Sequence, residues 1–228
     1  MPRAVRCGRV AGFGAFVLVL APHIARAQDP VPAAASDSRG AETARTSLTI
    51  VGTATLANGS IQGDAFDRRL VLTGIRYGRV LVSNGVLTFS FAPEFLPAAW
   101  LSQPILGEHH EPVQRKMPPL THTETTFGVG ANPIGAELTL RPQRKLQPLI
   151  GTEEGFLYFS RNVPSASGAR FNFTVNVRLG LRVRLDHGQA LSLEYNYHHL
   201  SNGYRAAENA GVDSQMVCFG YLKVLNGS

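Results

Sequence analysis

Alternation of apolar and polar residues is the most regular feature of the chain. In the segment 171–185, FNFTVNVRLGLRVRL, every odd position is apolar, whereas the even positions read Asn, Thr, Asn, Arg, Gly, Arg and Arg. A period of two residues predicts a β-strand, and this segment is longer than the five or six residues usual in soluble sheets. The segments 86–95 and 191–201 divide in the same way, with large apolar residues on one face and small, polar or charged residues on the other.

The polar faces of these strands favour a membrane barrel over a soluble β-sandwich. A sandwich would present mainly solvated Lys, Thr and Ser, but here arginines and glycines alternate with glutamates at Glu94, Glu137, Glu153 and Glu194. Charges that are removed from water must pair, so this mixture fits the lumen of a closed barrel whose apolar face meets lipid. We therefore predict an all-β fold, an eight-stranded antiparallel transmembrane β-barrel.

Turn residues and phase changes divide the chain into eight expected strands. These cover residues 48–56, 69–81, 85–97, 123–141, 146–159, 170–186, 189–201 and 212–225. The fourth changes phase at Asn132-Pro133, as a β-bulge would produce. Short connections at 83–85, 142–145 and 186–189 alternate with long ones near 57–68, 98–122, 160–169 and 202–211. Outer-membrane barrels have this asymmetry, with short periplasmic turns and longer external loops.

The N-terminal residues indicate export. Three arginines precede the uncharged run AGFGAFVLVLA, and Ala25-Arg26-Ala27 has the form of a cleavage site, so residues 1–27 are predicted to be a signal peptide. Residues 28–47 are rich in Ala, Ser and Pro and are expected to be a disordered lead-in to a barrel domain over 48–228. The leader holds four of the 22 Lys and Arg and none of the 16 acidic residues. The basic charge therefore gives no reason to expect a nucleic-acid partner.

Candidate chemistry lies in the stretch YHHLSNGYRAAENAGVDS, residues 197–214. His199 and Ser201 are two apart in a strand, so they leave the same face with their Cα atoms about 6.5–7 Å apart. By parity that face is the lipid-facing one, and Asp213 shares it in the next strand. Serine needs a base within hydrogen-bond reach and a third group to orient that base. We predict Ser201 as nucleophile, His199 as base and Asp213 as orienting acid, with Asn202 and the backbone N–H of Gly203 as oxyanion donors.

The same residues carry a resemblance to a known family. HLSNG (199–203) followed by NAGVDS (209–214) resembles the C-terminal signature of the PagL-type lipid A 3-O-deacylases, outer-membrane enzymes that remove an acyl chain from lipid A. Segments 72–81, 128–142, 146–159 and 171–185 are similar to the wider acyloxyacyl-hydrolase branch. The resemblance implies the same roles for His199, Ser201 and Asn202. Characterised members have glutamate at the position matching Asp213. Aspartate is one methylene shorter, so it reaches the imidazole either directly or after a backbone adjustment, and Ser-His-Asp triads elsewhere show that the chemistry permits it.

The resemblance and the lipid-facing parity together suggest an outer-membrane ester hydrolase for the 3-O acyl chain of lipid A, with lipopolysaccharide as its substrate and no cofactor. Arginines near the expected external loops are candidates for lipid A phosphates: Arg68, Arg69, Arg161, Arg170 and Arg205. The alternatives are a non-catalytic structural barrel and a phospholipid esterase of the same fold. The sequence predicts no particular oligomeric state.

Three other features carry no separate function. Adjacent histidines in GEHHEP (107–112) would point apart on an extended chain, so no metal site is expected there. His198 has lumen parity and is expected to partner Glu194 or an arginine. Cys218 is the one cysteine outside the leader, which leaves no intramolecular disulfide.

Overall fold

The computed structural model describes residues 46–59, 61–63, 65, 67–106 and 120–225. The expected signal peptide, the lead-in except for its last two residues, and GEHHEP lie outside these residues. The strands are β1 Thr46–Asn58, β2 Arg69–Ser83, β3 Leu87–Phe91, β4 Glu94–Leu106, β5 Leu120–Leu140, β6 Leu146–Val163, β7 Ala169–Arg184, β8 Gln189–Ser201 and β9 Val212–Leu225. In the described part of the chain no helix is long and apolar enough to cross a membrane.

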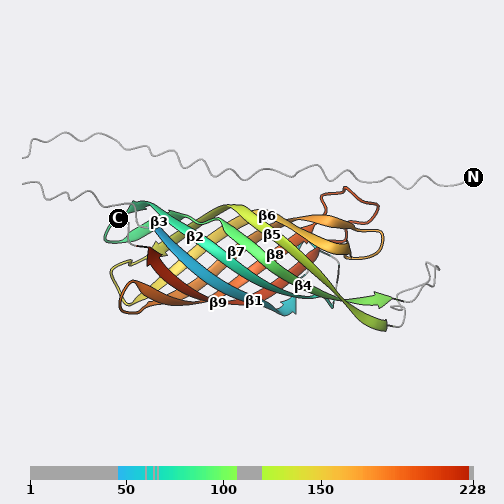
Figure 1. Ribbon diagram of the computed structural model, residues 1–228, viewed down its shortest axis with the longest axis horizontal. Helices are drawn as coiled ribbons and strands as arrows, with labels where there is room; N and C mark the ends of the chain where they lie inside the picture. The colour runs from blue at the N-terminus through green and yellow to red at the C-terminus, as the bar shows by residue number, and fades with distance from the viewer. Residues whose placement is uncertain (1–45, 60, 64, 66, 107–119, 226–228) are drawn as a thin grey trace, which may run out of the picture. The chain divides into compact units, whose positions relative to one another are not determined.

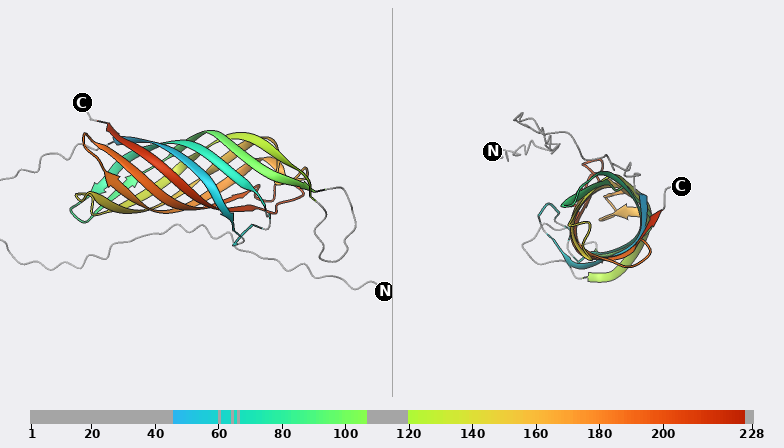
Figure 2. Two further views of the ribbon diagram at one scale, coloured as in Figure 1. Left: turned by 90° about the horizontal axis from the view of Figure 1, so that it is seen from below. Right: turned by 90° about the vertical axis from the view of Figure 1, so that its left-hand side faces the viewer.

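The strands close into a ring, which confirms the predicted barrel. Strands that follow one another in the chain pair antiparallel, except β3 and β4, and β1 pairs with both β2 and β9, so the sheet has no free edge. Strands β3 and β4 share one position, since each pairs with β2 on one side and β5 on the other. The ring therefore has eight strand positions. Figures 1 and 2 show the barrel from the side and along its axis. Closure matters in lipid because every backbone N–H and C=O must find a partner within the protein.

The third predicted strand is wrong in its length. Residues 85–97 were expected to be one strand followed by a loop, but the chain breaks at Ala92-Pro93 and then continues as β4 to Leu106. A register shift between Leu96 and Ala99 resets the phase of β4, so both residues face the lumen although they are three apart. Alternation is therefore lost locally while strand pairing continues. The expected bulge at Asn132-Pro133 is confirmed by the register shift between Ala131 and Ile134.

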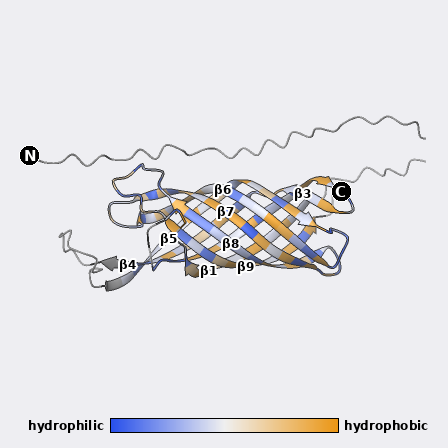
Figure 3. Cartoon of the chain, turned by 180° about the vertical axis from the view of Figure 1, so that it is seen from behind, coloured by the Kyte–Doolittle hydropathy of each residue, from blue (hydrophilic) through white to orange (hydrophobic). Residues whose placement is uncertain are grey.

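The outer wall is apolar, as the alternation predicts. Leu179, Leu193 and Phe219 each expose more than half of their surface, and the hydropathy colouring of Figure 3 shows orange residues alternating with blue and white ones along the strands. Many large hydrophobic residues on several strands are exposed in this way. A wall of this kind is stable against hydrocarbon and costly against water.

The middle of the lumen is filled by what we call the charge network: Arg76, Arg178, Arg182, Glu94, Glu137, Glu153 and Glu194. Arg76 reaches Glu94 and Glu153 at 2.9 Å and Glu194 at 3.4 Å. Arg178 reaches Glu194 at 2.5 Å and Glu153 at 3.1 Å. All of these residues except the partly buried Arg182 are buried, so each charge depends on its neighbours for the stabilisation that water would otherwise give.

The loop end of the lumen is apolar, which corrects the expectation of a uniformly polar interior. Here the loop end is the one that carries connections 59–68 and 202–211, and the turn end carries 84–86 and 185–188. Buried side chains at the loop end form what we call the apolar plug: Ala65, Leu70, Leu72, Leu96, Ala99, Leu101, Leu157, Phe159, Val163, Leu200, Val212 and Met216. The barrel is narrow enough for side chains to fill it, so near the loops both faces of the wall are apolar.

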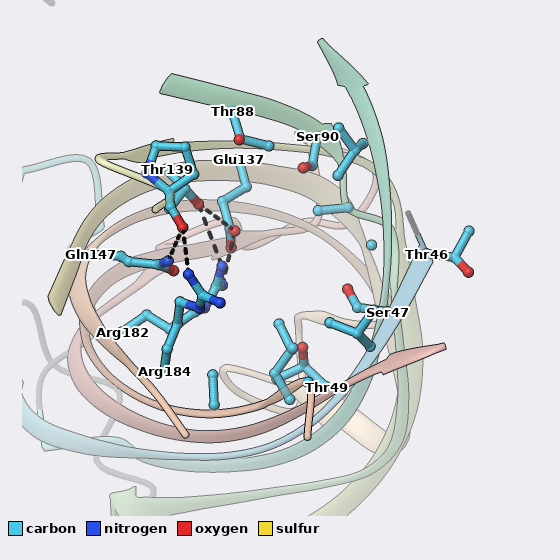
Figure 4. Close-up of a pocket in the computed structure, with 18 of the residues that line it drawn as sticks. Thr46, Ser47, Thr49, Thr88, Ser90, Glu137, Thr139, Gln147, Arg182 and Arg184 are labelled. Atoms are coloured by element: carbon cyan, nitrogen blue, oxygen red, sulfur yellow. Dashed lines mark hydrogen bonds and ion pairs between the residues drawn. The ribbon is translucent and has the colours of Figure 1, made fainter. Parts of the chain in front are cut away.

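The turn end of the lumen holds a polar cavity of about 570 Å³. In Figure 4 it is lined by Glu137, Thr139, Gln147, Arg182 and further polar side chains. Arg182 donates to Glu137 at 2.8 Å, and Gln147 donates to the Pro142 carbonyl at 2.6 Å. The cavity therefore lies between the charge network and the short turns of the barrel.

The charge network predicts a large stability difference between two arginines on β7. Arg178→Met should lower the free energy of unfolding by about 3–5 kcal/mol, because buried carboxylates lose their partner. Arg184 is exposed, so Arg184→Met should change it by less than about 0.5 kcal/mol. Urea unfolding in detergent micelles, followed by circular dichroism, measures both variants. Equal stability of the two would contradict the assigned role of the network.

Candidate active site

A histidine and an aspartate meet on the outer wall where β8 and β9 pair. His199 and Asp213 are direct partners across these strands, and His199 Nδ1 lies 2.6 Å from Asp213 Oδ1. An ionised carboxylate only accepts hydrogen bonds, so Nδ1 carries the proton and Nε2 keeps its lone pair. Nε2 is then the nitrogen available as a base.

Asp213 is covered, although its parity is that of the lipid-facing wall. The residue is fully buried because the β1–β2 connection passes over it. Its Oδ2 accepts hydrogen bonds from the backbone N–H groups of Ile61 at 2.8 Å, Gln62 at 2.7 Å and Gly63 at 2.9 Å. The sequence-based expectation of an aspartate facing lipid is therefore corrected, since N–H donors supply what water cannot at this position.

Two glycines allow the connection and the site to approach so closely. A Cβ on Gly63 would lie 2.9 Å from the carbonyl carbon of Gly211 and 3.0 Å from the Asp213 nitrogen. Gly211 has φ +65°, and a Cβ there would lie 3.1 Å from His199 Cε1. Any side chain at either position would push these groups apart.

Ser201 lies on the same outer face as His199, as predicted. It pairs with Phe173 of β7, and His199 pairs with Val175, so serine and histidine follow one another along the wall. The structure forms no hydrogen bond between these two described residues. Such contacts are often long in an unliganded enzyme and tighten when substrate binds. The structure thus joins two of the three predicted catalytic residues and places the third beside them.

Asn202 supports the loop that follows Ser201. Its buried side-chain amide donates to the Glu208 carbonyl at 2.6 Å, and its Oδ1 accepts from the Arg205 N–H at 3.2 Å. Its backbone N–H donates to Asn209 Oδ1 at 2.9 Å. Gly203 is exposed, with φ +63°. Of the two predicted oxyanion donors, Asn202 is therefore engaged in the loop, and the Gly203 N–H has no such bond among the described residues.

Asn209 contacts a predicted site residue, and the sequence reasoning did not single it out. Since its Oδ1 accepts from Asn202, its side chain is held in the loop that begins at Ser201, with its Nδ2 on the other side of the amide. The available signal was its place at the start of NAGVDS. Periodicity does not reach into loops, so it did not identify this residue.

An aromatic surface adjoins Ser201 on the outer wall. The rings of Phe171 and Phe173 meet edge to face at 5.2 Å, and Phe156 stacks on Phe171 at 5.4 Å. The guanidinium of Arg205 lies 5.4 Å from the Phe171 ring centroid, a cation–π distance. An apolar surface capped by a cation therefore lies beside the nucleophile candidate.

Two of the other arginines proposed for phosphate binding, Arg161 and Arg68, interact with neighbouring residues. Arg161 forms an ion pair with Glu124, and Arg68 donates to the Pro164 carbonyl at 3.2 Å. Burial lowers the pKa of Arg68, while Glu208 and Asp67 act in the opposite direction. Arg205 differs from these two because it lies on the loop that starts at Ser201.

His198 faces the lumen as its parity predicts, but its expected partners are wrong. It is buried, and both ring nitrogens lack a hydrogen-bond partner among the described residues. Its cross-strand neighbour, Ser214, is likewise buried with no partner for its hydroxyl. Within the ranges that the structure covers, no three His, Cys, Asp or Glu side chains are grouped to hold a metal ion.

These features define a transmembrane β-barrel with a histidine–aspartate pair and a neighbouring serine on its outer wall. A family model described as Lipid A 3-O-deacylase (PagL) matches residues 108–222, and the chain belongs to this family.

The chain is also similar to solved structures. The crystal structure of the outer membrane enzyme PagL superposes with a TM-score of 0.54 at 13% identity, covering 75% of this chain and 97% of that one. Neisserial surface protein A gives a TM-score of 0.41 at 13% identity, covering 78% and 96%. No curated protein sequence matches the chain.

The packing of Gly211 against His199 predicts a selective effect of a methyl group. Gly211→Ala and Gly188→Ala both place alanine at positive φ, so each should lose at least about 0.4–1 kcal/mol of stability. Gly188 lies at the turn end, whereas a methyl group on Gly211 would lie 3.1 Å from His199 Cε1, so only Gly211→Ala should slow labelling of Ser201 by a fluorophosphonate. Thermal unfolding and labelling rates measure the two effects separately. Equal labelling rates would show that Gly211 does not set the position of His199.

Proposed function

We propose that this chain is an outer-membrane deacylase that hydrolyses the ester-linked 3-O acyl chain of lipid A through Ser201, His199 and Asp213. The observation that carries the proposal is the 2.6 Å hydrogen bond between His199 and Asp213 on the outer wall, next to Ser201. Family membership supports the substrate. The proposed site needs neither a metal nor a cofactor.

The chemistry proceeds in two proton-balanced stages. His199 Nε2 takes the proton of Ser201 as its Oγ bonds to the ester carbonyl carbon, and the imidazolium then protonates the departing sugar oxygen. Water next attacks the acyl-serine with His199 again as base, which releases the fatty acid and restores the serine. Asp213 holds the imidazole tautomer and stabilises the imidazolium.

The oxyanion that forms in each stage requires N–H donors. We assign this role to the backbone N–H of Gly203, with the amides of Asn202 and Asn209 as further donors. One hydrogen of the Asn202 amide already goes to Glu208, so Gly203 is the principal donor in this proposal.

The site's position matches a substrate that lies in the membrane. The aromatic surface of Phe171 and Phe173 suits acyl chains, and Arg205 above it suits a phosphate through charge-assisted hydrogen bonds. In this proposal the signal peptide directs export, the turn end faces the periplasm, and the loop end faces outward, where lipopolysaccharide forms the outer leaflet.

Replacement of Ser201 tests the activity and the substrate together. Cells that express the wild type should yield lipid A lacking the 3-O acyl chain by mass spectrometry, and Ser201→Ala should leave lipid A intact. Ser214→Ala is the matched control, because that hydroxyl lies in the lumen without a partner and its loss should preserve activity. Intact lipid A with the wild type would favour a structural barrel, and accumulated lysophospholipid would favour a phospholipid esterase.

Asp213→Asn tests the role of the carboxylate. The three backbone N–H groups at Oδ2 require an acceptor, so asparagine should place its carbonyl there and turn its NH₂ toward Nδ1. That arrangement puts the imidazole proton on Nε2, the wrong nitrogen for a base, and kcat should fall by about 10⁴-fold. Steady-state hydrolysis of lipid A in micelles measures kcat and KM. A fall of less than about tenfold would exclude Asp213 as the orienting acid.

A further inference from the structure

One segment far from the catalytic residues in sequence closes around the site. We infer that the backbone N–H groups of Ile61, Gln62 and Gly63, which we call the amide clamp, position the histidine–aspartate pair for catalysis. This inference rests on the proposed function and assigns a positioning role to the β1–β2 connection. The clamp makes no direct hydrogen bond to His199 or Ser201, so it acts through Asp213.

The clamp converges on a single oxygen atom. Its three nitrogens lie 2.7–2.9 Å from Asp213 Oδ2, and Oδ1 is left for His199. The terminal torsion of an aspartate is broad and roughly two-fold, so an isolated carboxylate would turn freely about it. Three donors on one oxygen remove that freedom and direct the other oxygen at Nδ1.

The clamp is anchored on both sides by the backbone of β9 and its approach. The Gly59 N–H donates to the Asp213 carbonyl at 2.9 Å, and the Ala65 N–H donates to the Gly211 carbonyl at 3.2 Å. These bonds continue the pairing of β1 with β9 beyond its last pair, Asn58 with Ser214. The connection therefore extends the β1–β9 pairing that closes the barrel, and this pairing fixes the position of its N–H groups.

Close packing leaves the clamp little room to shift. Gly63 approaches both Gly211 and the Asp213 nitrogen within distances that no side chain would allow. A displacement of the clamp would therefore be passed to the Asp213 carboxylate, and through it to His199, and misplacement by about 1 Å is enough to slow a reaction on the order of 100-fold.

The test removes one N–H and keeps the rest of the full-length protein. Gln62→Pro lacks the donor, whereas Gln62→Ala keeps it and measures the cost of losing the side chain alone. Relative to Gln62→Ala, Gln62→Pro should lower kcat on the order of 10- to 100-fold with KM unchanged. In an Asp213→Ala background the same two variants should have equal kcat, because the clamp acts through the carboxylate.

A spectroscopic readout separates this inference from the proposed activity. The proton shared by His199 Nδ1 and Asp213 should give a downfield NMR signal in the wild type and in Gln62→Ala, which Gln62→Pro shifts or broadens. A wild type that shows the signal and its loss in Gln62→Pro, but deacylates no lipid A, would support the clamp and reject the proposed function. Active wild type with equal kcat in the two Gln62 variants would reject the clamp.

Folding is checked by the heat-dependent gel migration of the barrel. If Gln62→Pro does not fold, Gly63→Ala displaces the same segment without proline and should show the same selective loss of kcat. A rise in KM at constant kcat, or an equal loss with and without Asp213, would show that the connection serves substrate binding or stability and would overturn the inference.

Discussion

In a closed antiparallel barrel the wall is one strand thick, and consecutive side chains belong to opposite environments. On β8 and β9 this places His198 and Ser214 in the lumen and the adjoining pair, His199 and Asp213, on the outer wall. A shift of one residue in the pairing would exchange the two sets. The site therefore exists only while the register of these strands is held, and the register is held mainly from inside.

The lumen supplies that support in two different ways. At its middle, the charge network ties β2, β4, β5, β6, β7 and β8 together through paired arginines and glutamates. At the loop end the apolar plug takes over, and Leu200 and Val212, which pair with each other beside the site, both belong to it. Because these side chains are packed on the inner face, the outer face can carry polar groups without losing the order of its strands.

Much of the fold was predictable because lipid and lumen impose a strict period of two. The purest example, β7, was identified to within two residues, and the bulge in β5 was visible as a change of phase. The extension of β4 was not, because a bulge near Pro97 removes the alternation while the backbone pairing continues. The apolar plug was also missed, since a strand that is apolar on both faces shows no alternation of apolar and polar residues.

The same reasoning explains which parts of the site were found. Parity brought His199 and Asp213 to one face, and the structure pairs them. Parity says nothing of connections, so neither Asn209 nor the contact of Ile61–Gly63 with Asp213 followed from it. That contact joins residues about 150 positions apart, and it arises from closure of the ring between β1 and β9, which a local pattern does not contain.

The short side chain of Asp213 fits the distance between β8 and β9 and the position of the β1–β2 connection. Residues directly opposite on antiparallel strands have Cα atoms about 4.5–5.5 Å apart, which is short enough for aspartate to reach the imidazole, as the 2.6 Å contact shows. The shorter side chain therefore reaches the imidazole through direct pairing across β8 and β9. Its second oxygen then falls where the β1–β2 connection presents three N–H groups. Closure of the ring between β1 and β9 therefore brings the β1–β2 connection onto the carboxylate that faces His199.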